Sequence, residues 1–225
     1  MGRSFFAGMR FSLPGALRLV CCCIKAEAVI LLFPEEYDIM IAEIKETEAN
    51  HMHPIEHFLT ITRHRHMVML HCIKAGIPVQ GLLHDLSKYT PAEFIPGALF
   101  YQGTRSPNEE ERERNGYSAA WMHHKGRNKH HFEYWNDVNP ESKVYEPVEM
   151  PTRYLIEMFC DRVAASKIYR GSSYRDSDPL DYFLLGMKRG RPMHKNTAKQ
   201  LHFLLKMLAE KGEDATFAYI RRMKK

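Results

Sequence analysis

The histidines of this chain are concentrated in one stretch of its sequence. All of its 13 histidines except His194 and His202 lie between His51 and His131. Imidazole is the commonest metal ligand among side chains, and it also exchanges protons near neutral pH. A metal or proton-transfer site needs several such side chains at one point. The fold must therefore bring distant parts of this stretch together.

The hydrophobic pattern predicts helices, and no alternating pattern predicts a strand. Gly76 and Pro78 end the first predicted helix, whereas Thr90 and Glu93 mark a helix start with an N-cap hydroxyl. Asn128 is a candidate cap for a later helix. The predicted helices span residues 55–75, 79–86, 91–101, 117–124, 130–135, 152–169, 197–211 and 214–223, and a polar loop at 102–116 contains a solvated helical turn at 109–114. The expected fold class is all-α.

Residues 1–50 are predicted to form a poorly ordered N-terminal extension, and residues 51–225 one helical domain. The extension contains an apolar run at residues 16–33, which is interrupted by three charged side chains, Arg18, Lys25 and Glu27. Three charges in such a run argue against a membrane span. Basic residues precede the run, as in a signal peptide, but no clear small-residue cleavage site follows. We therefore expect an extension, or a start codon placed too far upstream.

The charge balance is mildly basic, with a net charge of +5 and a pI near 8.9. This balance favours anionic ligands such as phosphates, but it is not concentrated enough to predict specific nucleic-acid binding. The five cysteines include no C-x2-C pair, because three are consecutive and Cys72 and Cys160 are isolated. They indicate neither a zinc ribbon nor a disulfide framework, so a reducing, cytoplasmic location is expected.

The dipeptide His84–Asp85 is the first candidate metal-binding element. An imidazole and a carboxylate together suit divalent Zn, Mn, Fe, Co or Ni. Neighbours on a helix point about 100° apart, so both can approach one ion only if it lies against their helix. Asp161 is a second candidate, because a carboxylate on an apolar, alanine-rich helix face is costly unless it is paired or ligated. A salt bridge with Arg153 or Arg162 is the alternative.

The order of these residues, H…HD…H…H…D, resembles the HD-domain superfamily of metal-dependent phosphohydrolases. From about residue 57 to residue 217, the chain resembles more closely an uncharacterised bacterial and phage family of HD-like proteins, the DUF5662-like proteins. The shared segments are HD-x-SK at 84–88, HH-x5-HH at 123–131 and a helix carrying Glu157 and Asp161. The resemblance implies an HD-domain-like helical bundle with a metal site in its centre.

The resemblance also implies a set of metal ligands. His64 fits the first position because a small apolar residue, Val68, follows four residues later, although helical geometry leaves His66 open. His123 and His130 are alternatives within the double-histidine segment. One or two divalent ions, among Mn, Fe, Co, Ni, Zn and Mg, would be held by His64, His84, Asp85, His124, His131 and Asp161.

The activity implied by the resemblance is hydrolysis of a nucleotide or another small phosphorylated metabolite. Asp85 would bridge two ions or orient a water molecule, and Lys88 would stabilise charge on the phosphoryl group and bind the substrate. Lys125, Arg127 and Asn128 are the further substrate-binding candidates. Two alternatives stay open: an HD-type di-iron oxygenase with the same ligands, and a non-catalytic metal- or nucleotide-binding module with a closed site. The sequence does not decide the oligomeric state.

Overall fold

Two long helices, α3 (Pro54–Ala75) and α8 (Thr152–Arg170), pack against each other and support the other elements. They belong to the computed structural model of the chain, which describes residues 52–223. Helix α3 begins with a proline, whose fixed φ suits a first turn, and ends at Gly76 in the left-handed region, φ 77°. Its buried residues recur every three or four positions, so a single face of α3 is covered.

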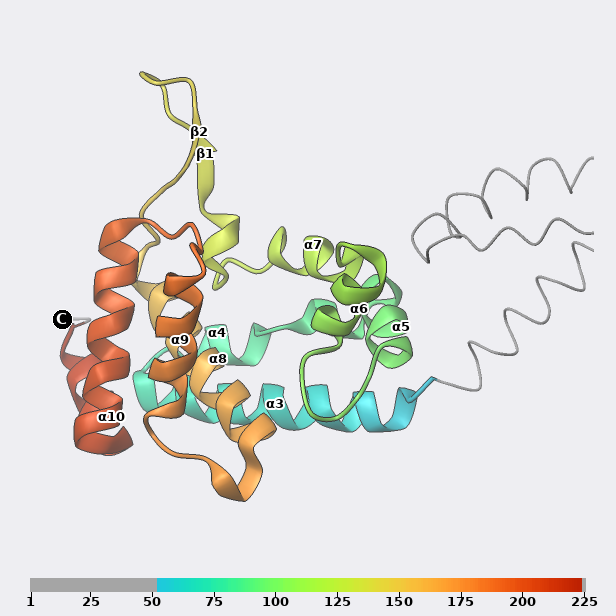
Figure 1. The fold of residues 1–225 in the computed structure, drawn as a ribbon. Coiled ribbons are helices and arrows are strands. Elements are labelled where there is room, and N and C mark those ends of the chain that lie inside the picture. Colours follow the sequence, from blue (N-terminus) through green and yellow to red (C-terminus); the bar gives the residue numbers. More distant parts are fainter. Residues whose placement is uncertain (1–51, 224–225) are drawn as a thin grey trace, which may run out of the picture. The chain divides into compact units, whose positions relative to one another are not determined.

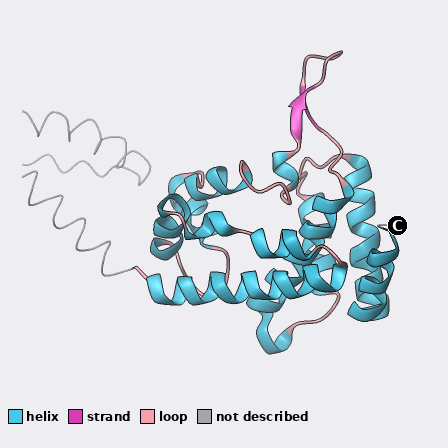
Figure 2. Ribbon diagram, turned by 180° about the vertical axis from the view of Figure 1, so that it is seen from behind, coloured by secondary structure: helices cyan, strands magenta, loops and turns pink. Residues whose placement is uncertain are grey.

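The remaining elements follow α3 and α8 in chain order (Figure 1). Between the two long helices lie α4 (Pro78–Leu83), η1 (Leu86–Tyr89), α5 (Pro91–Leu99), α6 (Pro107–Asn115), α7 (Ala119–Lys125), η2 (Phe132–Tyr134), β1 (Asn136–Val138) and β2 (Tyr145–Pro147). After α8 come η3 (Gly171–Ser173), α9 (Asp178–Lys188) and α10 (Lys195–Met223), which is broken at Gly212. Within residues 52–223, strand structure is confined to one antiparallel hairpin that projects from the helices (Figure 2). The predicted all-α class is therefore confirmed.

The main core lies where α3, α8 and α10 meet. Phe159 of α8 and Phe217 of α10 are almost fully buried, with their ring centroids 5.9 Å apart. The break at Gly212, φ 76° and ψ 176°, lets the last part of α10 turn and bury Phe217 and Ile220. Full burial of one such side chain stabilises the fold by roughly 1.5–3 kcal/mol. This core fixes the position of α8, which carries Glu157 and Asp161.

Several predicted elements differ from the structure. The predicted helix 79–86 is wrong at its end, because α4 stops at Leu83 and His84 is extended. The predicted polar loop 102–116 contains a full helix, α6, and the segment 130–135 forms only the short η2. Asn128 does not cap that segment, since its amide donates to Ser87 Oγ and to the His124 carbonyl. The hairpin and α9 were not predicted, although the Asp-Pro start of α9 is a recognisable helix signal.

The N-terminal segment is outside this description. The predicted poor order of residues 1–50, and the apolar run at 16–33, both fall outside the described residues. No helix within residues 52–223 has the length and apolar character that crossing a bilayer requires.

Gly81 is the point of closest approach between α4 and α3. A Cβ at this position would lie 2.6 Å from Cys72 Cβ and 3.0 Å from Met69 Cα, both on α3. Only glycine allows this contact without moving one of the two helices. Because His84 and Asp85 directly follow α4, the contact at Gly81 sets how close they come to α3.

Gly81→Ala should lower both stability and metal content. The added methyl group meets backbone atoms of α3, and overpacking of this kind costs about 1–3 kcal/mol. Thermal melting and elemental analysis measure the two effects. Val79→Ala is the matched control, since Val79 is 67% exposed on the same short helix. Unchanged melting and metal content in Gly81→Ala would contradict the role given to this contact.

Candidate metal centre

Side chains from five separate segments converge next to the turn that follows α4. His64 comes from α3, and His84 and Asp85 from the turn itself. His124 is on α7, and Asp161 is on α8. The loop between α7 and η2 adds two more histidines, His130 and His131. Their potential ligand atoms form two groups, each within 4.8 Å, and Asp85 is a member of both groups.

The first group lies between α3 and α8. His64 Nε2 is 3.0 Å from Asp161 Oδ1, and His84 Nε2 is 3.6 Å from the same oxygen. Asp85 Oδ2 faces this group, 3.3 Å from His84 Nε2 and 3.9 Å from His64 Nε2. Two imidazole nitrogens and two carboxylate oxygens at these distances could hold one divalent ion.

The second group lies on the other side of the Asp85 carboxylate. Asp85 Oδ1 is 3.3 Å from His124 Nε2 and 3.3 Å from His130 Nε2, and His131 completes the group. The two oxygens of one carboxylate therefore face different sets of histidines. This arrangement would let Asp85 bridge two ions.

The backbone at Asp85 is in a conformation that side chains rarely adopt. Its φ is 53°, in the left-handed region, and the residue lies between the end of α4 and the start of η1. Arg65 holds this turn, since its guanidinium donates to the carbonyls of Leu82 and His84, at 2.5 and 3.1 Å. Backbone strain of this kind persists where the surroundings enforce it, often at functional sites. The strained turn places the carboxylate between the two groups of histidines.

Glu157 orients two of the histidines from outside the groups. Its Oε1 lies 3.1 Å from His84 Nδ1 and 3.2 Å from His130 Nδ1. These three residues could also hold an ion themselves, but the distances are those of hydrogen bonds. Although burial opposes ionisation, the two histidines lower the pKa of Glu157 to about 2. An ionised Glu157 keeps a proton on each Nδ1 and leaves each Nε2 free as a ligand.

Glu93 performs the same task for His124. Its Oε2 is 2.7 Å from His124 Nδ1, and its other oxygen is 2.7 Å from His123 Nδ1. Glu93 is the third residue of α5, where the sequence predicted a helix start with Thr90 as the N-cap hydroxyl. Instead, the Thr90 hydroxyl donates to the Ser87 carbonyl. The Glu93 carboxylate therefore accepts hydrogen bonds from the histidines and does not cap the helix end.

Several buried polar atoms of the site have no hydrogen-bond partner among residues 52–223, which bears on whether a metal fits there. Each buried polar atom without a partner costs about 1–3 kcal/mol, so such atoms are rare in native proteins. Here the buried atoms without a hydrogen-bond partner include His64 Nε2, His84 Nε2, His130 Nε2, His131 Nε2 and Asp85 Oδ1. All five belong to the two groups. Divalent cations at these positions would satisfy them, so the residues fit a metal centre.

The charges of the groups favour cation binding. Burial opposes ionisation of Asp85 and Asp161, but the facing histidines, and for Asp85 also Lys88, outweigh it and hold both pKa values well below the usual range. Burial also opposes protonation of His84, yet the adjacent carboxylates raise its pKa well above the usual value. His84 must lose this proton to bind an ion, so metal affinity should weaken as the pH falls.

The structure separates the alternatives for the metal ligands. His66 is exposed on α3 and lies outside both groups, whereas His64 is buried within the first. His123 contacts Glu93 and belongs to neither group. His130 and His131 both belong to the second group, so the segment supplies one histidine more than expected. Asp161 forms its close contacts with histidines, and the alternative salt bridge with Arg153 or Arg162 is not formed.

The four expected substrate-binding residues differ in their position relative to the metal-binding groups. Lys88 Nζ lies 2.7 Å from Asp85 Oδ2 and lines a cavity beside the groups. Arg127 is exposed and donates to the His123 carbonyl, and neither Arg127 nor Lys125 lines that cavity. Asn128 fixes the loop after α7 by its bonds to Ser87 and His124. Of the four candidates, Lys88 and Asn128 lie beside the metal-binding groups, and Lys88 is the one that also lines the cavity.

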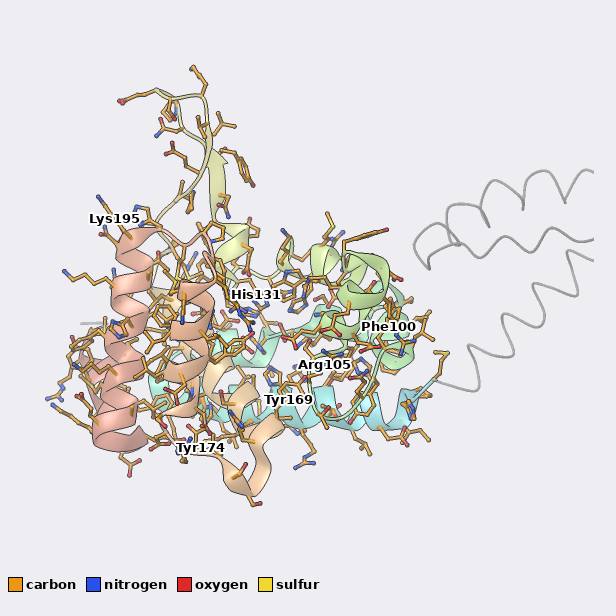
Figure 3. All side chains as sticks on the ribbon, in the orientation of Figure 1. Phe100, Arg105, His131, Tyr169, Tyr174 and Lys195 are labelled. Atoms are coloured by element: carbon orange, nitrogen blue, oxygen red, sulfur yellow. The ribbon has the colours of Figure 1, made fainter. Side chains whose placement is uncertain are left out.

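A cavity of about 710 Å³ opens next to the two groups. His64, His131 and Asp161 form part of its wall. Its wall also includes Arg105, from the α5–α6 loop, and Tyr169, near the end of α8, which are both labelled in Figure 3. A small molecule in this cavity could therefore reach both groups of ligands.

Loss of either residue of the His84–Asp85 pair should remove most of the metal. His84→Ala deletes one ligand of the first group, and Asp85→Ala deletes the residue common to both. Elemental analysis of the purified variants measures the effect. His66→Ala is the matched control and should keep its metal, because His66 is exposed two residues along α3 from His64. Normal metal content in both His84→Ala and Asp85→Ala would rule out this centre.

Glu157→Gln should weaken metal binding without removing a ligand. The neutral amide oxygen accepts from Nδ1 of His84 and His130 more weakly than the carboxylate does, and mutation of such an outer partner typically costs about 10–100-fold in metal affinity. A competition titration with a chromogenic chelator measures the affinity. Glu210→Gln is the control, because its carboxylate is exposed and pairs with Lys206. Equal affinity in the two variants would show that Glu157 does not support the histidines.

Comparison with known proteins identifies a family for most of this chain. Residues 53–207 match the model of a family of unknown function, DUF5662, which covers all the residues of the two groups. No curated protein matches the chain, and no solved structure does. On the strength of a match that spans more than half of its length, the chain belongs to the DUF5662 family.

Proposed function

We propose that this chain is a metal-dependent phosphohydrolase of the HD-domain type that acts on a small phosphorylated molecule. The observation that carries the proposal is the position of Asp85, whose two oxygens face two groups of histidines beside an open cavity. The order of the ligands along the chain supports the HD assignment. A carboxylate shared by two cation sites is suited to phosphoryl transfer, in which both attacking and leaving oxygens need stabilisation.

The protein's own residues would hold and orient the reacting groups. Bound divalent ions would supply a water of lowered pKa and would polarise a phosphoryl oxygen. Asp85 would fix the separation of the two ion sites, and Glu157 would hold a proton on Nδ1 of His84 and His130. Glu93 would do the same for His124. These contacts are formed before any substrate binds, so little reorganisation is needed during the reaction.

Lys88 is the candidate for charge stabilisation. Its ammonium pairs with Asp85 Oδ2 and faces the cavity, and its pKa is raised, because the charges of Asp85 and Asp161 outweigh the effect of burial. A phosphoryl group next to the two ion sites would come within reach of this ammonium. Lys88 would then neutralise negative charge that develops on the phosphoryl oxygens.

The cavity favours an enzyme over a closed binding module. A purely structural metal site is expected to have all its ligand positions filled and no access for a substrate. Here His64, His131 and Asp161 belong both to the ligand groups and to the cavity wall. A volume of about 710 Å³ is in the range of sites for small molecules. A nucleotide or a phosphorylated metabolite is the substrate class that this supports.

The proposal is tested by metal analysis and a phosphatase assay. We expect the purified protein to contain a divalent metal and to hydrolyse phosphate monoesters when Mn, Co, Ni or Mg is added separately. Lys88→Gln should retain its metal, because Lys88 is not a ligand, and should lose at least about a hundredfold in kcat through loss of a charge-stabilising donor. Inductively coupled plasma analysis and phosphate release measure these two quantities.

Arg127→Gln is the matched control, since Arg127 is exposed and lies outside the cavity wall. Its rate should equal that of the wild type. A metal-loaded protein that hydrolyses no phosphate ester would overturn the proposal. Oxygen consumption that is abolished under anaerobic conditions would instead assign the centre to the oxygenase class.

A further inference from the structure

Two arginines of the cavity wall form no ion pair with any residue of the described range, 52–223. Arg162 follows the candidate ligand Asp161 on α8, and Arg191 lies in the segment between α9 and α10. Within residues 52–223, no carboxylate lies within 4.0 Å of either guanidinium. Arg105 and Arg170 of the same cavity are paired with carboxylates, and Arg112 is exposed. Within residues 52–223, Arg162 and Arg191 are therefore the partly buried arginines of this wall that have no acidic partner.

Arg191 is held in a fixed position by α9. Its N–H donates to the Gly186 carbonyl at 3.2 Å, after a turn at Gly190 with φ 77°. The side chain then folds back over Gly186, where a Cβ would lie 2.9 Å from Arg191 Cδ and 3.1 Å from Cζ. Its guanidinium donates to the Tyr182 hydroxyl at 3.0 Å and lies 4.9 Å from that ring's centroid. The position is preorganised, and it depends on a glycine within a helix.

Arg162 is the less satisfied member of the pair. Its Nε is buried and has no hydrogen-bond partner. Burial and the charge of Arg191 lower the pKa of its guanidinium, whereas the charges of Glu133 and Asp161 act in the opposite direction. Glu133 also has a buried oxygen without a partner, and burial raises the pKa of its carboxyl group. Placing two like-charged guanidinium groups together in a partly buried wall costs free energy. A bound anion that contacts both groups would offset this cost.

We propose that Arg162 and Arg191 form an anion subsite for a second anionic group of the substrate. The planar fork of arginine matches phosphate and carboxylate oxygens, and both side chains line the cavity that reaches the metal-binding groups. The substrate class is thereby narrowed to phosphorylated molecules that carry a further phosphate or carboxylate. This part of the inference rests on the proposed phosphohydrolase function. The presence of an anion site does not.

The first experiment measures binding of inorganic phosphate to the full chain. Phosphate is titrated at constant ionic strength into the protein as purified with its metal, and again after chelation. Binding that survives chelation reports the arginine pair, and its Kd should rise at least about tenfold in Arg162→Gln and Arg191→Gln. Arg189→Gln is the matched control, because Arg189 is exposed, lies outside the cavity wall and is two residues from Arg191. Acetate in place of phosphate shows which anionic group the pair prefers.

Gly186→Ala provides a variant that keeps both charges. The new methyl group displaces the Arg191 guanidinium, so phosphate binding should weaken as it does in Arg191→Gln. Melting temperatures in chloride buffer establish that each variant is folded. Phosphate binding that is absent from the wild type after chelation, or unchanged in both arginine variants, would overturn the subsite.

The second experiment separates the subsite from the reaction. With p-nitrophenyl phosphate, which has one anionic group, KM should stay within about twofold in Arg191→Gln, whereas with fructose 1,6-bisphosphate or 3-phosphoglycerate it should rise about tenfold. Absence of hydrolysis with every metal, together with arginine-dependent phosphate binding, would leave the subsite standing and remove the phosphohydrolase function. Hydrolysis with equal KM values for wild type and Arg191→Gln on all three compounds would remove the subsite alone.

Discussion

The site depends on the Asp85 carboxylate, which is buried and faces histidines on both sides. Its two oxygens lie 3.3 Å from the Nε2 atoms of His84, His124 and His130, from three different segments of the chain. Burying a carboxylate is costly unless it is paired, so these histidines and Lys88 are needed to keep it ionised. Every other feature of the centre, from the strained turn to the outer glutamates, keeps these partners in place.

The fold supplies this arrangement through a few close contacts between helices. Gly81 lets α4 rest on α3, Arg65 holds the turn that follows, and the core around Phe159 places α8 opposite α3. Glu157 then reaches both His84 and His130 from α8. The result is a set of imidazoles that face the Asp85 and Asp161 carboxylates, and within residues 52–223 the Nε2 atoms of His64, His84, His130 and His131 have no hydrogen-bond partner. Such unsatisfied atoms are what a metal centre requires, and they are otherwise difficult to explain.

The cavity beside the candidate metal centre has room for a small substrate. Its wall combines candidate metal ligands with Lys88, Arg162 and Arg191. Lys88 is paired with Asp85, whereas the two arginines have no acidic partner within residues 52–223. A cationic surface that remains unpaired inside a cavity is suited to an anionic ligand. The two arginines were not singled out as substrate-binding residues from the sequence, because Arg162 was considered only as a partner of Asp161.

The sequence alone determined the helical class, the long helices α3 and α8, and the types of side chain that form the site. Those features depend on local periodicity and on residue chemistry, which a sequence displays directly. It did not determine the end of α4 at Leu83, the choice of His64 over His66, or the inclusion of both His130 and His131. Those features depend on distances between segments far apart in the chain. Only the tertiary structure fixes these distances, together with the glutamates that select which nitrogen of His84, His124 and His130 is free.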